Sequence, residues 1–168
     1  PLDTPVICAY IRPVKRPPLI LASTSPRRAE LLRQLQVEFR VVPSDATELW
    51  HEHLSPLELC QLNAHRKARA VAKKHPDALV LGADTLVFLR NEIMGKPRDL
   101  AGAREMLTRL RGRTHQVVTG VSLIHLRSHQ ERIFAISTDV LFRDFNEATL
   151  SEYLATVDTL DKAGAYAI

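Results

Sequence analysis

The apolar positions of the chain form short continuous runs and longer helical stripes, which together predict an order of strands and helices. Leu19-Ile20-Leu21-Ala22 is a short apolar run typical of a buried strand, and it stops at Ser23-Thr24-Ser25. Ser25 suits the N-cap of a helix and Pro26 its first position. Three leucines form the apolar stripe that follows: Leu31, Leu32 and Leu35. The pattern predicts a buried strand, a tight turn and a helix that ends near Gln36.

The next segments continue this alternation of strands and helices. Residues 37–42 predict a second strand, and the capping box Ser55-Pro56-Leu57-Glu58 opens a helix that runs to about Lys74. One face of this helix is apolar at Leu57, Cys60, Ala64, Ala68 and Val71. Residues 78–81 predict a short buried strand that leads into Gly82-Ala83-Asp84-Thr85, and residues 86–89 continue extended.

The second half of the chain predicts longer strands. After a hairpin turn at residues 90–92, Asp99 caps a helix that Gly112 ends. That helix is apolar at Ala103, Met106, Leu107 and Leu110, and a final helix over residues 147–157 at Leu150, Tyr153, Leu154 and Val157. Between them, strands over residues 116–126 and 132–142 are joined by a polar turn. Early alternation followed by antiparallel strands predicts an α/β domain on a mixed, twisted sheet.

Composition indicates one domain and few special constraints. The chain has 168 residues, of which 45% are hydrophobic and 25% charged, as in ordinary globular proteins. Residues 1–18 hold five of the ten prolines and predict a flexible lead-in, which leaves residues 19–168 as the domain. Two cysteines favour a reducing compartment, and we expect a cytoplasmic protein. No apolar stretch approaches the roughly 20 residues that span a bilayer, so no membrane association is expected.

The net charge of +4 permits a polyanionic partner. Nucleic-acid surfaces are usually dense basic stripes with aromatic side chains between the charges. Here the basic residues are dispersed and aromatic residues make up only 5% of the chain. A small phosphorylated ligand is therefore favoured over RNA or DNA.

Four places in the sequence carry candidate chemistry. Ser23, Arg27 and Arg28 surround a predicted helix start, where free N–H groups and the helix dipole favour an anion such as phosphate; an ordinary capped helix is the alternative. Asp84, which follows a buried strand, has the chemistry to hold a divalent cation or accept a proton from water. An isolated turn aspartate is the alternative.

Two lysines and a glutamate are less specific. Lys96 in Gly95-Lys96-Pro97 is able to reach a phosphate, although a lone lysine is usually a solvated surface residue. Lys67 lies at the border of the apolar helix face and points toward the protein body, where a snorkelling side chain is the simpler interpretation. Glu48 lies in a polar loop. No zinc-type histidine spacing accompanies these residues, and His115 and Cys60 are predicted to be structural.

Six short motifs in order resemble the Maf family of nucleoside triphosphate pyrophosphatases. They are Leu21-Ala22-Ser23-Thr24-Ser25-Pro26-Arg27-Arg28, Lys67-Ala68, Gly82-Ala83-Asp84-Thr85, Gly95-Lys96-Pro97, Gly112-Arg113-Thr114-His115 and Asp161-Lys162-Ala163-Gly164-Ala165-Tyr166. The resemblance covers residues 19–168. It implies a two-lobed α/β fold around a central cleft, related to the inosine triphosphate pyrophosphatases, and hydrolysis of nucleoside triphosphates to a monophosphate and pyrophosphate with Mg²⁺ or Mn²⁺.

The resemblance also implies residue roles. Ser23, Arg27 and Arg28 would bind the triphosphate, and Asp84 would accept a proton. Lys67 and Lys96 would contact phosphate or water near the bond that breaks, and Glu48 would join Asp84 around the metal. Arg28 and Thr85 match the branch that acts on dTTP and UTP rather than the branch that acts on 7-methyl-GTP, whose members usually carry Gly-Ser-Asp-Gln.

Other expectations remain open at this point. The family usually continues past Gly-Ala-Tyr-Gly-Ile-Gln, whereas this sequence reads Gly164-Ala165-Tyr166-Ala167-Ile168 and stops, so we expect the family's C-terminal segment to be missing. A non-catalytic nucleotide-binding regulator of septum formation is the competing function, and an RNA-binding role is the third. A homodimer is a family expectation only.

Overall fold

The computed structural model describes residues 16–90 and 92–166 of the chain. Its elements follow one another as β1 (Leu19–Leu21), α1 (Pro26–Gln34), β2 (Phe39–Val41), α2 (Pro56–Lys74), β3 (Leu79–Leu89), β4 (Glu92–Met94), α3 (Leu100–Leu110), β5 (Thr114–His125), the 3₁₀ turn η1 (Leu126–Ser128), β6 (Gln130–Leu141), α4 (Glu147–Thr156) and the 3₁₀ turn η2 (Ala163–Ala165). Most lie within a few residues of their predicted positions. Two predictions fall partly outside the described residues. Asn91 belongs to the predicted hairpin turn and residues 1–15 to the predicted flexible lead-in, and neither is described.

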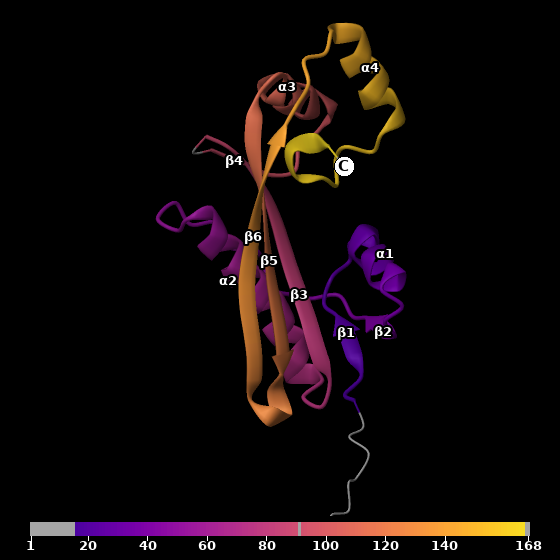
Figure 1. Cartoon of the computed structure of the whole chain (residues 1–168), viewed down its shortest axis with the longest axis vertical. Helices are drawn as coiled ribbons and strands as arrows, with labels where there is room; N and C mark the ends of the chain where they lie inside the picture. Colours follow the sequence, from indigo (N-terminus) through magenta and orange to yellow (C-terminus); the bar gives the residue numbers. More distant parts are fainter. Residues whose placement is uncertain (1–15, 91, 167–168) are drawn as a thin grey trace, which may run out of the picture.

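The strands form one mixed sheet, as predicted. Over the described residues it has six strands in the order β2-β1-β3-β5-β6, and β4 adds to β3 beside this path. β1 is parallel to both β2 and β3, whereas β5 is antiparallel to both of its neighbours, β3 and β6. Figure 1 shows β3, β5 and β6 running along the long axis of the molecule, with β1, β2 and α1 to one side. The fold class is therefore confirmed as mixed α/β.

β3 departs from the sequence prediction in a way that matters for the site. The buried strand was expected to end at Leu81, with Asp84 after it, but β3 continues without a break from Leu79 to Leu89. The prediction that Asp84 follows the end of a strand is wrong, because Asp84 pairs with Gly120 in the middle of the ladder with β5. Ten consecutive pairs with β5 keep this segment extended, and their hydrogen bonds outweigh the turn preference of glycine and aspartate.

The opposite edge of β3 is only partly covered. β1 pairs with β3 up to Leu81, and β4 pairs with it from Val87 onward. Within the described part of the chain, residues 82–86 therefore have no strand on that edge. We refer to this segment as the open edge of β3. Asp84 lies just past the level at which β1, the parallel neighbour of β3, ends, and α/β sheets commonly bind ligands beside such strand ends.

Helix α2 packs very closely against the sheet. A Cβ atom at Gly82 would lie 2.4 Å from the backbone oxygen of Ala64, and one at Gly120 would lie 2.3 Å from the carbonyl group of Cys60. Neither glycine leaves room for a side chain, so the helix backbone rests directly on β3 and β5. This contact brings the polar side chains on the same face of α2 within hydrogen-bond reach of β3.

The buried residues form separate clusters along the sheet. α2 packs on one part of it through residues such as Leu59, Ala68 and Val71. At the other end, α3, α4 and η2 enclose a cluster that includes Leu107, Leu110 and Leu150. These two groups of helices are separated along the long axis (Figure 1). The arrangement agrees with the two-lobed α/β fold that the resemblance implies.

Helix α1 differs from its prediction in its cap and in the burial of its apolar residues. Ser25 occupies the N-cap position, but its side chain makes no capping hydrogen bond. The predicted apolar stripe is not buried: Leu31 is 59% exposed and Leu35 70% exposed, and Ala29 is the buried residue of the helix. The periodicity therefore identified the helix but not a buried face.

The remaining helix signals are confirmed. Ser55 and Glu58 form the capping box of α2, and the Asp99 side chain accepts a hydrogen bond from the backbone N–H of Gly102 at the start of α3. Gly112 follows α3 with φ of +64°, a conformation that glycine adopts readily. Among the described residues, no helix combines the length and apolar character needed to cross a bilayer.

The close contact between α2 and the sheet predicts that a glycine-to-alanine substitution destabilises the protein at Gly120 but not at Gly102. Gly120→Ala should lower the free energy of unfolding by about 3 kcal/mol, since only the backbone of Cys60 and Gln61 is available to move. Gly102→Ala is the control, because its Cβ meets nothing closer than 3.5 Å and alanine favours helix by roughly 0.5–1 kcal/mol. Urea unfolding measures both changes; a neutral Gly120→Ala variant would contradict the close contact.

Candidate functional site

An ion-paired cluster occupies the face of β3 that packs on α2. The Nζ atom of Lys67 lies 2.7 Å from Oδ1 of Asp84 and 2.6 Å from Oε1 of Glu48. The side chains of Lys67 and Asp84 are 14% and 5% exposed, whereas that of Glu48 is 59% exposed. Lys67 is therefore not a snorkelling side chain. One ammonium group bridges two carboxylates, one buried and one open to solvent.

Asn63 joins this cluster and was missed by the sequence analysis. Its side chain is almost fully buried, and its Nδ2 donates to Oδ2 of Asp84 at 3.3 Å. The same amide bonds both backbone groups of Leu49, beside Glu48. Asn63 precedes Lys67 by four residues, a spacing that places both side chains on one helix face. This spacing was the available signal, and it was overlooked because asparagine carries no charge.

A second set of side chains lies at the open edge of β3. The guanidinium of Arg28 donates through Nη1 to the carbonyl oxygen of Ala83 at 2.9 Å and to the hydroxyl of Ser23 at 3.2 Å. Its Nη2 donates to the hydroxyl of Thr85 at 3.1 Å. Arg28 thus takes a position where a neighbouring strand would otherwise bind β3. Side chains alternate along a strand, so Thr85 points to the face opposite that of Asp84.

Arg27 and Lys96 are exposed and complete the positive charge around the site. The pKa of Asp161 is lowered first by a hydrogen bond from Lys162, and the charges of Arg27 and Lys96 lower it further. Lys96 also lowers the pKa of Glu48, so it lies within electrostatic range of the carboxylates of Asp161 and Glu48. A hydrogen bond from the N–H of Gly164 to the carbonyl of Gly95 holds the lysine's segment against η2.

Two pKa shifts describe the electrostatics of the cluster. Partial burial would raise the pKa of Glu48, but the hydrogen bond and charge of Lys67 outweigh it, so the pKa is lowered. Burial lowers the pKa of Arg28, although Asp84 and Glu48 act in the opposite direction. A free guanidinium titrates far above neutral pH, so Arg28 keeps its charge. At neutral pH the site therefore holds ionised groups of both signs beside one another.

The acidic residues of the cluster are able to hold Mg²⁺ only if a bound molecule supplies further oxygen ligands. No group of three or more His, Cys, Asp or Glu side chains suited to a metal is found among residues 16–90 and 92–166. Asp84 and Glu48 offer two carboxylates that share Lys67. Mg²⁺ is commonly held by one or two carboxylates together with substrate phosphates and water. The donor set fits a cation that arrives with a phosphorylated substrate.

His115 and Cys60 are structural, as predicted. The thiol of Cys60 is buried and donates to the carbonyl of Val118, and burial raises its pKa to about 12. The Nε2 atom of His115 lies 2.5 Å from the hydroxyl of Tyr166, and burial lowers the pKa of this histidine. Neither side chain reaches the Asp84 cluster by a described hydrogen bond.

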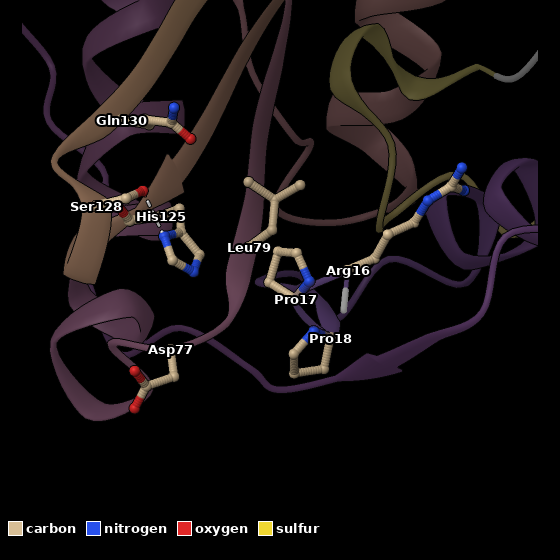
Figure 2. Close-up of a pocket in the computed structure, with 8 residues that line it drawn as sticks. All are labelled: Arg16, Pro17, Pro18, Asp77, Leu79, His125, Ser128 and Gln130. Carbon is tan, nitrogen blue, oxygen red and sulfur yellow. Dashed lines mark hydrogen bonds between the residues drawn. The ribbon is translucent and has the colours of Figure 1, made fainter. Parts of the chain in front are cut away.

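A separate shallow pocket lies at the far end of β3. Its lining includes Pro17, Pro18, Asp77, Leu79 and His125 (Figure 2). Leu79 is five residues before Asp84 along an extended strand, which corresponds to about 17 Å. None of the predicted site residues lines this pocket. The candidate site is therefore the cluster around Asp84 and Arg28 rather than this hollow.

The arrangement combines features needed for chemistry on a phosphate chain. It holds Lys67 on one face of β3 and Arg28 at its open edge, with Arg27 and Lys96 exposed nearby, and these cations are able to compensate a polyanion. Asp84 is a buried carboxylate whose two oxygens each keep a lone pair beyond the bonds from Lys67 and Asn63. Such a carboxylate is able to orient a water molecule and accept its proton.

Comparison with known proteins extends this description. The family described as "Maf-like protein" matches residues 18–168. A dTTP/UTP pyrophosphatase from Akkermansia muciniphila is 46% identical over 151 residues, which cover 90% of this chain and 79% of the relative. Relatives with the same name from Clostridioides difficile and Symbiobacterium thermophilum are 43% and 47% identical over 150 residues; 89% of the chain is covered in both, with 77% and 76% of the relatives.

Among solved structures, a HAM1 protein from Coxiella burnetii matches with a TM-score of 0.46 and 16% sequence identity. The match covers 73% of this chain and 71% of that chain.

The bridging position of Lys67 predicts a pH-dependent loss of stability in Lys67→Met. At pH 7 the variant should lose about 3 kcal/mol, because a buried Asp84 is left without its cation. The pKa of Glu48 is lowered in the folded protein, so its ion pair with Lys67 stabilises the wild type at pH values above about 4.3, the pKa of a glutamate in an unfolded chain. This stabilisation is lost as the pH falls through the lowered pKa of the folded state. The difference between the proteins should therefore narrow below about pH 4 in urea unfolding.

Lys74→Met is the matched control. Lys74 lies on the same helix and pairs with Asp45, but both side chains are more than half exposed, so its loss should change stability by less than about 1 kcal/mol. A penalty for Lys67→Met that is equal at pH 7 and pH 3.5 would show that the lysine acts by packing alone.

Proposed function

Because this chain belongs to the Maf family, we propose that it is a nucleoside triphosphate pyrophosphatase that acts on dTTP and UTP. The reaction would release pyrophosphate and leave the nucleoside monophosphate. The observation that carries the proposal is the meeting of Asp84 and Lys67 with Arg28 at the open edge of β3. The names of the relatives from three bacteria support the same substrates.

Charge compensation is the first task of such a site. A triphosphate carries about four negative charges, and charge shifts to the leaving pyrophosphate as the bond breaks. Arg27 and Lys96 are exposed and free to follow the phosphates, whereas Arg28 is already held by Ser23 and Thr85. A fixed guanidinium with two mobile cations would hold one phosphate in place while the others adjust.

Activation of water is the second task. We assign Asp84 as the group that orients a water molecule and accepts its proton, while the water oxygen attacks the α-phosphorus. The bond from that phosphorus to the bridging oxygen breaks, and pyrophosphate leaves. Lys67 donates to Oδ1 of Asp84 and keeps the carboxylate in position.

A divalent cation is part of the proposal. Asp84 and Glu48 would hold Mg²⁺ or Mn²⁺ together with phosphate oxygens, since two carboxylates are too few to enclose it alone. When bound, such a cation stabilises negative charge on the phosphates. Glu48 suits this role because its side chain is more than half exposed and its pKa is lowered, so the carboxylate is ionised at neutral pH.

Nucleotide choice is assigned to Arg28 and Thr85. The two side chains are hydrogen-bonded to each other, and Thr85 also lies 3.2 Å from the hydroxyl of Thr119. This chain of contacts gives the open edge a defined shape on the face away from Asp84. A change at either residue would alter which base fits beside the phosphates.

The setting and the alternatives follow from the same observations. A free buried Cys60 fits the expectation of a reducing, cytoplasmic compartment, and a homodimer stays a family expectation. A non-catalytic nucleotide-binding regulator would retain Arg27, Arg28 and Lys96 but would not need the paired Asp84 and Lys67. The names of the relatives favour the enzyme over this alternative, over a 7-methyl-GTP preference and over RNA binding.

Asp84→Asn should fold normally and lose turnover by about a thousandfold, because the amide no longer accepts a proton from water. Pyrophosphate release from dTTP and UTP with Mg²⁺ or Mn²⁺ measures the effect. The control is Asp77→Asn, which changes an exposed carboxylate paired with Arg127 at the far end of β3 and should retain activity. Near-wild-type turnover by Asp84→Asn would contradict the assignment.

Arg28→Ala should raise KM for dTTP and UTP and change the ranking of nucleotides in a panel of triphosphates. The guanidinium links Ser23, Ala83 and Thr85, so its loss opens the edge of β3. Arg33→Ala is the control from the same helix, since Arg33 makes only an exposed pair with Glu30 among the described ion pairs. An unchanged substrate profile for Arg28→Ala would count against its role in selection.

A further inference from the structure

We propose that Asn63 is a positioning residue of the active site, which holds the Asp84 carboxylate and the loop of Glu48 in one arrangement. The inference rests on the proposed function, since it assigns Asn63 a part in the same reaction. Asn63 would not touch substrate. It would act through Asp84 on one side and through the backbone beside Glu48 on the other.

The hydrogen bonds of Asn63 use its whole amide group. Oδ1 accepts from the N–H of Leu49 at 2.8 Å. Nδ2 donates to the carbonyl of Leu49 at 3.1 Å and to Oδ2 of Asp84 at 3.3 Å. Both hydrogens of the amide and one of its lone pairs are therefore engaged. Only 2% of the residue is exposed, so water does not readily replace a lost partner.

The backbone of Leu49 decides which way the amide faces. A backbone N–H is always a donor and a carbonyl always an acceptor, so Oδ1 must face the first and Nδ2 the second. A flipped amide would place Nδ2 against the N–H of Leu49, and Oδ1 against the carbonyl of Leu49 and Oδ2 of Asp84. The second N–H of Nδ2 consequently points to Asp84. The backbone of Leu49 thus determines that Asp84 accepts a hydrogen bond from Asn63 on this side.

This donor makes the two oxygens of Asp84 different from each other. Oδ1 lies against the ammonium of Lys67 at 2.7 Å, and Oδ2 lies against the neutral amide of Asn63. Two donors from successive turns of α2 fix the plane of the carboxylate on both sides. A carboxylate that is free to rotate about its Cβ–Cγ bond would present a water molecule to the phosphorus in many directions.

The same amide anchors an irregular segment of the chain. Residues 43–54, between β2 and α2, contain no helix or strand. Within this segment Glu48 is largely exposed, and its described bond is to Lys67. The paired bonds from Asn63 to Leu49 anchor the backbone one residue away from Glu48. Asn63 therefore links the placement of the two carboxylates that the proposed reaction requires.

Two substitutions separate these two actions. Asn63→Ala removes all three bonds, so kcat for dTTP should fall about 10–100-fold. Asn63→Asp has nearly the same shape and keeps an acceptor for the Leu49 N–H, but it places an acceptor against both Asp84 and the carbonyl of Leu49. It should lower kcat at least as much, while the Leu49 amide remains protected from hydrogen exchange. In Asn63→Ala that amide should exchange faster. In both variants KM should stay within about threefold, since the phosphate-binding cations are untouched.

Cys60→Ala is the matched control for lost stability. Cys60 is buried on the same helix one turn earlier, and its thiol donates to the carbonyl of Val118. The change removes a buried hydrogen bond without touching the polar contacts of Asp84 or Leu49. Thermal melting of all variants shows whether they fold, and Cys60→Ala should keep the kcat of the wild type.

The outcomes separate the two proposals. A wild type that releases no pyrophosphate from dTTP or UTP overturns the proposed function and this inference with it. An active wild type whose Asn63→Ala and Asn63→Asp variants fold and retain kcat overturns the inference alone. A loss in Asn63→Ala that Cys60→Ala reproduces, or that appears only in KM, also overturns it, because it would then reflect general destabilisation or substrate binding.

Discussion

The site depends on the close contact between α2 and the two central strands. Gly82 and Gly120 leave no space for side chains between the helix backbone and the sheet. At this separation the short side chain of Asn63 reaches Asp84 directly, and the amine of Lys67 lies between two carboxylates. A wider gap would admit solvent, and the same residues would then be solvated separately rather than joined in one network.

The open edge of β3 supplies the second half of the site. β1 stops and β4 begins further on, so residues 82–86 keep an unpaired strand edge in the described structure. An exposed edge is normally covered or charged. Here the guanidinium of Arg28 binds the carbonyl of Ala83, and this places a cation near Asp84 without a direct bond between them. Asp84 is therefore flanked by two basic residues, Lys67 on the face that packs on α2 and Arg28 at the open edge.

Several features were predictable from local patterns because local physics decides them. The capping box at Ser55 and the Asp99 cap satisfy the free N–H groups of their own helices and need no partner from elsewhere. By contrast, periodicity in α1 identified a helix but wrongly implied that Leu31 and Leu35 are buried. Burial depends on what packs against the helix, and no local pattern contains that information.

For the candidate site, the sequence by itself determined the chemical inventory: the basic pair at the start of α1, the aspartate beside Gly82 and the two lysines, all recognisable by type and order. Only the tertiary structure decided that Asp84 lies within a continuous strand, that Lys67 bridges it to Glu48, and that Asn63 belongs with them. The physical reason is that hydrogen bonds and ion pairs require contact within about 3 Å. Residues 17 to 57 positions apart acquire such contact only because α2 packs on β3 and α1 lies where Arg28 reaches the open edge of that strand.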